Sequence, residues 1–458
     1  MTTLAIELND ASIAVAQSDG LLATEPGCAI ETSDGIAFGD AALRSSRLRP
    51  RDTNDRYWAE LSVTPLARPL AQAKSAADLA HAQLIQLWNR FGEAADDILL
   101  AVPGSFDREK LGLLLGIADA CEIPVAGMVD AAVAACDRPY PGWDSIHIEA
   151  QLHGFGFTQI GHAQRGTGEE AVAEAFETVG QSGVAELHER WARRIARAFV
   201  AQTRFDPLSD GKTEQRLFDA LPGWLEAFGS LPSATVEFDL DRATRSIQLS
   251  REDIVAEAAD VYDCLADRVA AARCPGRGLA VRLGSILAGL PGAKDRLAEI
   301  AGVRVVALPA GAGALGALAC ANDIRSRPGQ TTLVKSVGWR APAGQLPALR
   351  PDELDDSVSE ATHLLIRDTA YPIGDAPLNL RFAEAGQLEV MAGSAGERVD
   401  FALRRSEAGL LLECAEGMNV LVNANPRKPD TQLRSGDRLT IVGSAEEARL
   451  ISVRNRHA

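Results

Sequence analysis

The stretch that decides the fold is residues 148–158, which read Ile-Glu-Ala-Gln-Leu-His-Gly-Phe-Gly-Phe-Thr. Apolar residues stand on both sides of a short polar turn, and this pattern is typical of two strands joined in a hairpin. We therefore expect strands at residues 145–150 and 155–160. The helix and strand patterns before and after this hairpin indicate the fold class.

Four polar side chains alternate along this hairpin and would share one face of its first strand. They are His147, Glu149, Gln151 and His153. Such a row could hold a metal ion, because imidazole and carboxylate groups are metal ligands. We favour the alternative that they line the open, solvated side of the hairpin, since polar residues at every second position are the usual pattern of a half-buried strand.

Strand and helix patterns alternate along the first 325 residues. Residues 1–38 favour paired strands, and the sequence from 168 to 228 is expected to be mostly helical. Further strands are expected at 98–102, 125–129, 234–238 and 279–283, and further helices at 66–91, 108–121, 251–272, 294–301 and 312–322. Alternation of this kind is typical of an α/β protein.

The composition changes after residue 325. Residues 326–360 are rich in proline, serine and acidic residues, which predicts a linker. From there to the end, short strand patterns alternate with turns, which favours a small all-β sandwich. We expect an α/β domain of residues 1–325, a linker of residues 326–360 and a β domain of residues 361–458.

The composition indicates which classes of partner the protein could bind and in which cellular compartment it works. The chain has 458 residues and a formal net charge of −17, which disfavours nucleic acid and anionic membrane surfaces as partners. No apolar run is long enough for membrane insertion, and the N-terminus lacks the basic segment of a signal peptide. The seven cysteines are scattered and form no Cys-x-x-Cys pair, which favours reduced thiols and a cytoplasmic location.

An ordered set of motifs runs through the α/β part. The motifs are Ala-Ile-Glu-Leu-Asn-Asp-Ala-Ser at 5–12, Val-Pro-Gly-Ser-Phe at 102–106, the turn at 149–156, Leu-Gly-Ser at 283–285 and Gly-Ala-Leu-Gly-Ala at 313–317. In order and spacing they resemble the nucleotide-binding domain of the DnaK-type heat-shock chaperones, within the actin-like ATPase superfamily. The resemblance implies an actin-like ATPase fold of two related lobes with a nucleotide site between them.

The resemblance also implies which residues would contact the nucleotide. The implied set is Glu7, Asn9, Glu149, Gly284, Ser285, Gly313 and Gly316. Glu7 and Glu149 stand where the family has the two aspartates that hold the metal and its water. Asn9 stands in place of a loop glycine.

The chain departs from the family where phosphate would bind. Gln151, Leu152 and His153 fill a turn whose glycines, in the family, let backbone N–H groups approach phosphate closely. Asp10 stands in place of a threonine and would bring a negative charge next to the phosphate. We therefore expect no catalytic residues, no dedicated metal site and, at best, weak binding of ATP and Mg²⁺.

The C-terminal part carries looser motifs. They are Tyr-Pro-Ile-Gly at 371–374, Gly-Met-Asn-Val-Leu-Val-Asn at 417–423 and a Leu-Arg-Ser-Gly-Asp run at 433–437. Residues 361–458 resemble a forkhead-associated domain, which implies a protein-interaction domain. Asp375 stands where that family has a phosphate-binding arginine, so we expect no preference for phosphothreonine.

These features predict a chaperone-like pseudo-ATPase that acts as a scaffold or adaptor and binds other proteins through its C-terminal domain. The alternative is an active ATP-dependent chaperone-type ATPase in which Glu7 and Glu149 hold Mg²⁺. The C-terminal part lacks the long helical lid of such chaperones, which favours the adaptor.

One further surface feature is a basic helix face. It is formed by Arg190, Arg193, Arg194 and Arg197, spaced so that they lie on one side of a predicted helix. We expect a solvated face, and docking of an acidic partner is the alternative.

Overall fold

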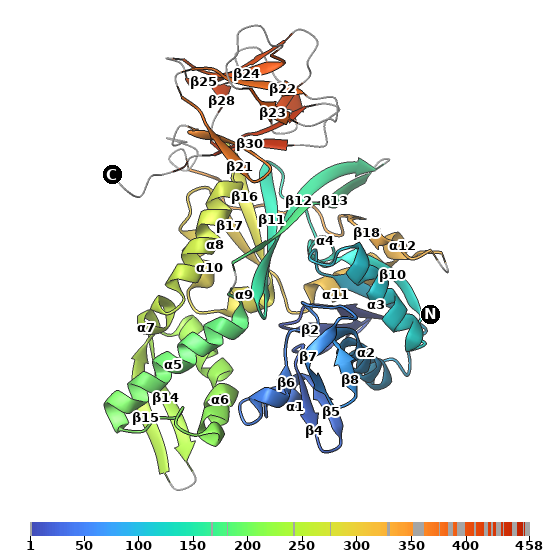
Figure 1. The fold of residues 1–458 in the computed structure, drawn as a ribbon, viewed down its shortest axis with the longest axis vertical. Coiled ribbons are helices and arrows are strands. Elements are labelled where there is room, and N and C mark those ends of the chain that lie inside the picture. Colours follow the sequence, from blue (N-terminus) through green and yellow to red (C-terminus); the bar gives the residue numbers. More distant parts are fainter. Residues whose placement is uncertain are drawn as a thin grey trace. The chain divides into compact units, whose positions relative to one another are not determined.

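The fold is given by a computed structural model of the chain (Figure 1). The residues that the structure describes are 2–165, 168–180, 182–240, 243–274, 276–327, 330–350, 361–374, 376–382, 388–391, 399–406, 409–415, 420–422, 425–426, 432–433, 435–441, 447–451 and 453. The chain forms two compact units. The first consists of Met1–Asp267 and Ala280–Leu346, and the second of Arg268–Leu279 and Pro347–Ala458.

The first unit contains a six-stranded sheet in the order β18-β10-β9-β1-β2-β3. Neighbouring strands β1, β2 and β3 form an antiparallel meander, and β9 and β10 add on in parallel on the other side of β1. The strands are β1 (Thr3–Glu7), β2 (Ile13–Gln17), β3 (Gly20–Glu25), β9 (Asp97–Val102), β10 (Val125–Asp130) and β18 (Leu333–Val334).

A second six-stranded sheet has the order β17-β16-β11-β12-β13-β19. Its strands are β11 (Trp143–Gln151), β12 (Gly154–Arg165), β13 (Gly168–Val179), β16 (Gly278–Leu283), β17 (Val303–Ala307) and β19 (Ser336–Gly338). Strands β11, β12 and β13 form an antiparallel meander, and the two later strands β16 and β17 lie beyond β11. The two sheets therefore share one order of strands, a meander followed by two later strands beside its first member.

Alternation along β1 and β9 assigns the two faces of the first sheet. Leu4, Ile6, Ile98 and Leu100 pack in one apolar cluster with the helices α2 (Ala76–Phe91) and α3 (Arg108–Ala120). The intervening alanines and Leu99 pack on the other face with α4 (Ala131–Ala135) and α11 (Ala312–Ala319). Small residues on that face let α11 approach the sheet and α4 closely.

Local sequence explains where these helices begin. Ser75 and Asp78 form a reciprocal capping box at the start of α2. Asp107 caps α3 by accepting the backbone N–H of Lys110, and Asp130 caps α4. The remaining elements near this sheet are α1 (Gly39–Leu43), a 3₁₀ turn (Pro50–Asp52), α12 (Ala321–Ile324) and the strands β4 (Ala29–Thr32), β5 (Gly35–Phe38), β6 (Thr53–Asn54), β7 (Pro65–Leu70) and β8 (Ala73–Ser75).

A helical region follows the second meander in the sequence. It contains a separate two-stranded sheet, and Trp191 and Phe199 of its first helix are fully buried. Its elements are α5 (Val184–Thr203), α6 (Gly211–Ser230), β14 (Ser233–Leu240), β15 (Ala243–Ser250), α7 (Arg251–Ala256) and α8 (Ala259–Ala272). Two short helices, α9 (Ser285–Gly289) and α10 (Ala293–Ala298), connect β16 to β17.

The second unit contains two antiparallel sheets that share one apolar cluster around Leu364, Leu380 and Phe401. Their orders are β21-β20-β30-β29-β26-β27 and β23-β22-β24-β25-β28. The strands are β20 (His363–Ile366), β21 (Thr369–Pro372), β22 (Leu378–Phe382), β23 (Leu388–Val390), β24 (Phe401–Ser406), β25 (Gly409–Cys414), β26 (Val420–Val422), β27 (Asn425–Pro426), β28 (Gln432–Leu433), β29 (Arg438–Ile441) and β30 (Glu447–Ile451). The structure thus confirms a mixed α/β chain with an all-β region near its C-terminus.

The expected helix from 168 to 228 is wrong in its first part. Residues 168–179 form β13, which pairs along its length with β12. Their many alanine and glutamate side chains favour helix locally, but pairing with a neighbouring strand overrides such a weak preference. Likewise, the long helix expected at 66–91 begins only at Ala76, and 65–70 is a strand.

The expected linker of residues 326–360 also needs correction. Residues 333–334 form β18, which pairs with β10 of the first sheet, and residues 336–338 form β19, which pairs with β13 of the second. The first compact unit therefore continues to Leu346. Short edge strands of two or three residues carry too little periodicity to stand out in a sequence. The acidic part of the expected linker, 351–360, lies outside the described residues.

Candidate functional site

The candidate site lies where the ends of β1 and β11 meet. Glu7 is the last residue of β1, and Glu149 lies near the end of β11. Between them, Asn9 donates its side-chain N–H to Glu149 Oε1 at 2.6 Å and to the carbonyl of Ala150 at 3.0 Å. The backbone N–H of Ala314, in the first turn of α11, donates to Glu7 Oε2 at 3.1 Å. The chain thus satisfies both glutamates with its own donors.

Asp10 makes a second hydrogen bond between the loop that follows β1 and the turn that follows β11. Its Oδ1 accepts the backbone N–H of Leu152 at 2.9 Å, across 142 positions of sequence. Leu152 lies in the turn that, by the resemblance, would offer backbone N–H groups to phosphate. The Asp10 carboxylate therefore accepts a backbone N–H of this turn that would otherwise be available to a phosphate. Asp10 is only 6% exposed, so this bond is shielded from water.

The implied glycines crowd against these same carboxyl groups. A Cβ placed on Gly284 would lie 2.9 Å from Glu149 Oε1, and one placed on Gly313 would lie 2.7 Å from Glu7 Cδ. Ser285 lines a small cavity together with Glu7 and Glu149. The lack of a side chain at Gly284 and Gly313 therefore leaves space for the carboxyl groups of Glu149 and Glu7.

Gly316 has a different place from the other implied residues. A Cβ on it would lie 1.7 Å from the carbonyl oxygen of Ala134, in α4. Its lack of a side chain lets α11 and α4 pack together. The structure therefore brings together six of the seven implied residues and places Gly316 at a contact between helices.

The space around Glu7 and Glu149 is small. Two cavities border the pair, with volumes of about 20 Å³ and about 10 Å³. One water molecule needs roughly 10–15 Å³ of such volume, and sites for ligands of nucleotide size have about 300 Å³ or more. These two cavities fit single waters, and neither takes a nucleotide with its metal ion. A neighbouring cavity of about 430 Å³ is lined by Asp10, Gln151 and Phe176, and neither Glu7 nor Glu149 is part of its lining.

Phe176 of β13 fills part of this region. Its ring lies so close to Gly104 and Gly156 that a Cβ on either glycine would lie 2.4 Å and 3.1 Å, respectively, from ring atoms. Sequence reasoning missed Phe176, because its segment was expected to be helical. The signal that could have found it is the pair of glycines at positions 154 and 156, directly after the turn. Glycines within a strand mark places where another group approaches the backbone closely.

Burial controls the charge of the two glutamates. Burial raises the pKa of Glu7 to about 7. Burial, together with the nearby charge of Glu7, raises the pKa of Glu149 to about 8. At pH 7 Glu149 is therefore mostly protonated and Glu7 about half protonated. Mg²⁺ binds ionised carboxylates, so binding it here would require the loss of these protons.

The expectation of a solvated polar row on β11 is wrong for His147. His147 is 2% exposed, and its Nε2 lies 3.4 Å from Glu149 Oε2. Burial, with a smaller effect of Arg282, lowers the pKa of His147 to about 4. A neutral imidazole beside a protonated glutamate is not an ion pair. His153 lies apart from this group, with its Nε2 3.3 Å from Asp55 Oδ1.

The metal-row alternative finds no support within the described part of the chain. No group of three or more histidine, cysteine, aspartate or glutamate side chains there could hold a metal ion. None of the helices in those residues is long and apolar enough to cross a membrane. Asp375, which stands in place of the phosphate-binding arginine, lies outside the described residues, and so does most of the motif at 417–423.

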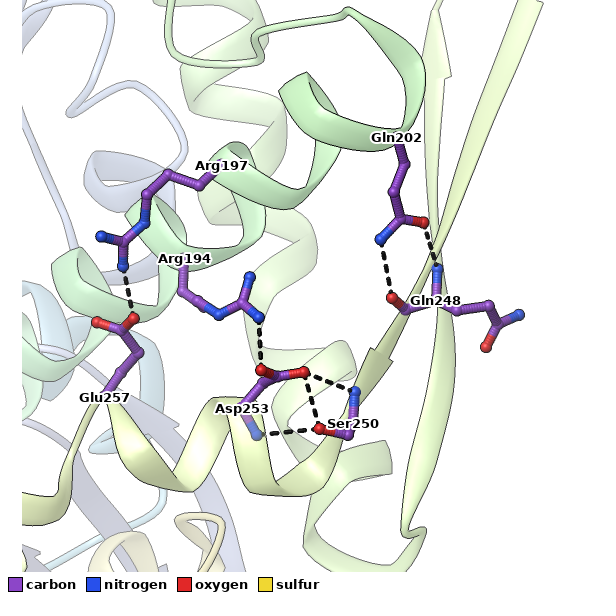
Figure 2. A network of polar contacts seen from close by, with 7 residues as sticks. All are labelled: Arg194, Arg197, Gln202, Gln248, Ser250, Asp253 and Glu257. Atoms are coloured by element: carbon purple, nitrogen blue, oxygen red, sulfur yellow. Dashed lines mark hydrogen bonds and ion pairs between the residues drawn. The ribbon is translucent and has the colours of Figure 1, made fainter.

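The basic face of α5 is paired with acidic groups of the same chain. Figure 2 shows Arg194 bonded to Asp253 at 2.6 Å and Arg197 bonded to Glu257. Arg190 pairs with Asp260, and Arg193 lies 3.7 Å from Glu186. The pairs of Arg194 and Arg197 border an open cavity of about 490 Å³ between α5, β15 and α7. Because its arginines are paired, this face has little free positive charge with which to attract an acidic partner.

Comparison with known proteins gives no relative for the chain. No known protein family matches it, and no curated protein is similar to it.

Proposed function

We propose that the chain is a chaperone-like pseudo-ATPase, which acts as a scaffold or adaptor and binds other proteins through its C-terminal all-β region. Its first unit has, in this proposal, the actin-like ATPase fold of two related lobes. The shared strand order of the two six-stranded sheets supports this, because a meander followed by two later strands occurs in both.

The observation that carries the proposal is the occupied cleft. Asn9 and Asp10 bond across it to Glu149 and Leu152, at the positions where loops of an ATPase would hold phosphates. Phosphoryl transfer needs a positioned metal and donors aimed at the γ-phosphate. Here the donors already have partners within the chain.

A cleft closed by internal bonds suits a scaffold. An ATPase cycles because nucleotide changes the relative stability of two conformations. Bonds that persist without nucleotide hold one conformation, which presents a constant surface to partner proteins. All seven cysteines are free thiols, which supports the cytoplasmic location that we propose.

The test is calorimetric titration of the full chain with ATP and ADP, with and without Mg²⁺. We expect no binding heat at nucleotide concentrations up to about 1 mM, which bounds the affinity at about −4 kcal/mol. The double variant Asn9→Gly/Asp10→Thr removes both cross-cleft ties and should bind more tightly than wild type. Asp19→Thr, in the exposed β2–β3 turn, is the matched control and should behave as wild type.

Single-turnover hydrolysis separates the two candidate functions. The pseudo-ATPase predicts no turnover by wild type. Turnover by wild type that is abolished both by Glu7→Ala and by Glu149→Ala would instead establish the active chaperone-type ATPase, with the two glutamates as metal ligands.

A further inference from the structure

A fully buried arginine lies in the second six-stranded sheet. Arg282 is the fifth residue of β16, an otherwise apolar strand, and it is 0% exposed. One nitrogen, Nη2, donates to the carbonyl of Arg138 at 2.6 Å. Its Nε and Nη1 are buried and have no hydrogen-bond partner among the described residues. Burying a guanidinium with two unpaired N–H donors costs free energy of folding unless an acceptor bonds to them.

The neighbours of Arg282 include two aromatic rings and, among the described residues, further buried polar atoms without a hydrogen-bond partner. Its guanidinium carbon lies 4.7 Å from the ring centre of Tyr140 and 5.7 Å from that of Trp339. The indole Nε1 of Trp339 is itself buried without a partner, and so is the hydroxyl of Ser145 on the adjacent strand β11. Two buried side chains with unpaired N–H groups, Arg282 and Trp339, therefore lie close together. An indole N–H can only donate, so it needs an acceptor from elsewhere.

The charges around this group leave it positive. The nearby carboxylate, Asp137, is paired with Arg138 at 2.8 Å. Arg340 donates to Cys320 Sγ at 3.3 Å and has no ion pair in the described part of the chain. The pKa of Asp137 is lowered by its bond to Arg138 and by the charge of Arg282. The thiol of Cys136, also near Arg282, stays neutral, because burial raises its pKa to about 11.

We propose that Arg282 and Trp339 hold a small monovalent anion, such as chloride or a short free carboxylate. The anion would accept hydrogen bonds from Arg282 Nε, Arg282 Nη1 and Trp339 Nε1. It would also balance the buried positive charge of Arg282, which forms no ion pair with a carboxylate among the described residues. Size limits the ligand, because Arg282 has no exposed surface. The proposal goes beyond the pseudo-ATPase function and does not depend on it.

The test measures thermal unfolding of the full chain while chloride replaces gluconate at constant ionic strength. A specific site stabilises the folded chain in a saturable way. We expect chloride and bromide to raise the Tm of wild type by about 2 °C, with saturation. Arg282→Met should lose this increase. Arg304→Met is the matched control, an arginine on the neighbouring strand β17 beside the ring of Trp143, and it should retain it.

A milder variant guards against misfolding of Arg282→Met. Trp339→Phe keeps an aromatic ring and removes only the Nε1–H. The loss of one hydrogen bond to a charged group should weaken chloride binding roughly tenfold. Crystals soaked in bromide should show an anomalous peak within hydrogen-bond distance of Arg282 Nε or Nη1.

Two results would overturn the proposal. One is a Tm of wild type that does not depend on which anion is present at fixed ionic strength. The other is a bromide-soaked crystal with ordered water alone beside Arg282, which would mean that water satisfies these donors.

Discussion

The cleft between the two sheets and the surface of α5 use the same kinds of side chain in opposite ways. On α5, arginines and carboxylates form ion pairs that are partly open to water, such as Arg194 with Asp253. In the cleft, Glu7 and Glu149 form no ion pair with lysine or arginine among the described residues, and burial raises their pKa values to about 7 and about 8. The cleft is therefore sensitive to geometry and to pH, whereas the α5 surface is sensitive to salt.

This difference bears on function. A cleft that must admit a nucleotide and a metal ion needs space beside its metal-binding carboxylates. The cavities that border Glu7 and Glu149 in the described residues have only about 20 and 10 Å³, although a cavity of about 430 Å³ lies next to them at Asp10 and Gln151. A surface whose charges are paired internally is stable without a partner. The comparison predicts large and pH-dependent effects for changes near the cleft and small, salt-dependent effects for changes on α5.

The largest effect is expected at α11, the helix that bonds Glu7. In Gly316→Ala the new Cβ would lie 1.7 Å from the carbonyl of Ala134, so α11 or α4 has to move. We expect a loss of about 3 kcal/mol in the free energy of unfolding. Urea denaturation measures it.

The matched control is Gly116→Ala, within α3. Apart from its chain neighbours and the backbone of its own helix, no described atom lies within 4 Å of its added Cβ. Glycine is also the poorer helix former, so this variant should gain roughly 0.5–1 kcal/mol. Equal effects of the two substitutions would contradict close packing of α11 on α4.

The next effect tests the protonated glutamates. The folded pKa values of Glu7 and Glu149 lie above the ordinary value of 4.5, at about 7 and about 8. Their contribution to stability is therefore present below pH 4.5 and is lost as pH rises through 7 and 8. Glu149→Gln keeps an acceptor for Asn9 and carries no charge. It should be more stable than wild type at pH 8.5, by on the order of 2 kcal/mol, and similar at pH 5.

Glu60→Gln controls for the loss of one negative charge, because Glu60 is exposed and lies 3.7 Å from Arg56 in a surface pair. Its difference from wild type should not change between the two pH values. If Glu149→Gln behaved like Glu60→Gln, Glu149 would be ionised at neutral pH, and the active ATPase would gain support.

The hairpin around Glu149 could be predicted from sequence, because apolar strands on both sides of a turn leave a strong local signal. The structure pairs Glu149 with Gly156, as that reading requires. The strand at 168–179 could not be predicted from sequence, because its alanines and glutamates favour helix. It is a strand only because it pairs with β12.

The candidate site shows the same division. The order of the motifs predicted one site that contains Glu7, Asn9 and Glu149, and these residues lie together in the structure. The bond from Asp10 to Leu152 depends on packing between segments 142 positions apart, which no local pattern encodes. Arg282 left a visible signal, a single charged residue inside the apolar strand at 279–283, which sequence reasoning passed over.

The smallest effect is expected on α5, where two bonds of one carboxylate can be separated. Asp253 accepts from Arg194 through Oδ1 and from the hydroxyl of Ser250 through Oδ2, and Ser250 caps α7 (Figure 2). Exposed ion pairs contribute roughly 0.2–1 kcal/mol and are screened by salt, whereas loss of a helix cap costs about 1 kcal/mol. Arg194→Ala should therefore destabilise less than Ser250→Ala in 50 mM salt, and its effect should vanish in 0.5 M salt while that of Ser250→Ala persists. Urea denaturation at the two salt concentrations distinguishes them. An effect of Arg194→Ala above about 2 kcal/mol that persists in salt would show that this face behaves like the buried cleft, and the contrast between the two regions would fail.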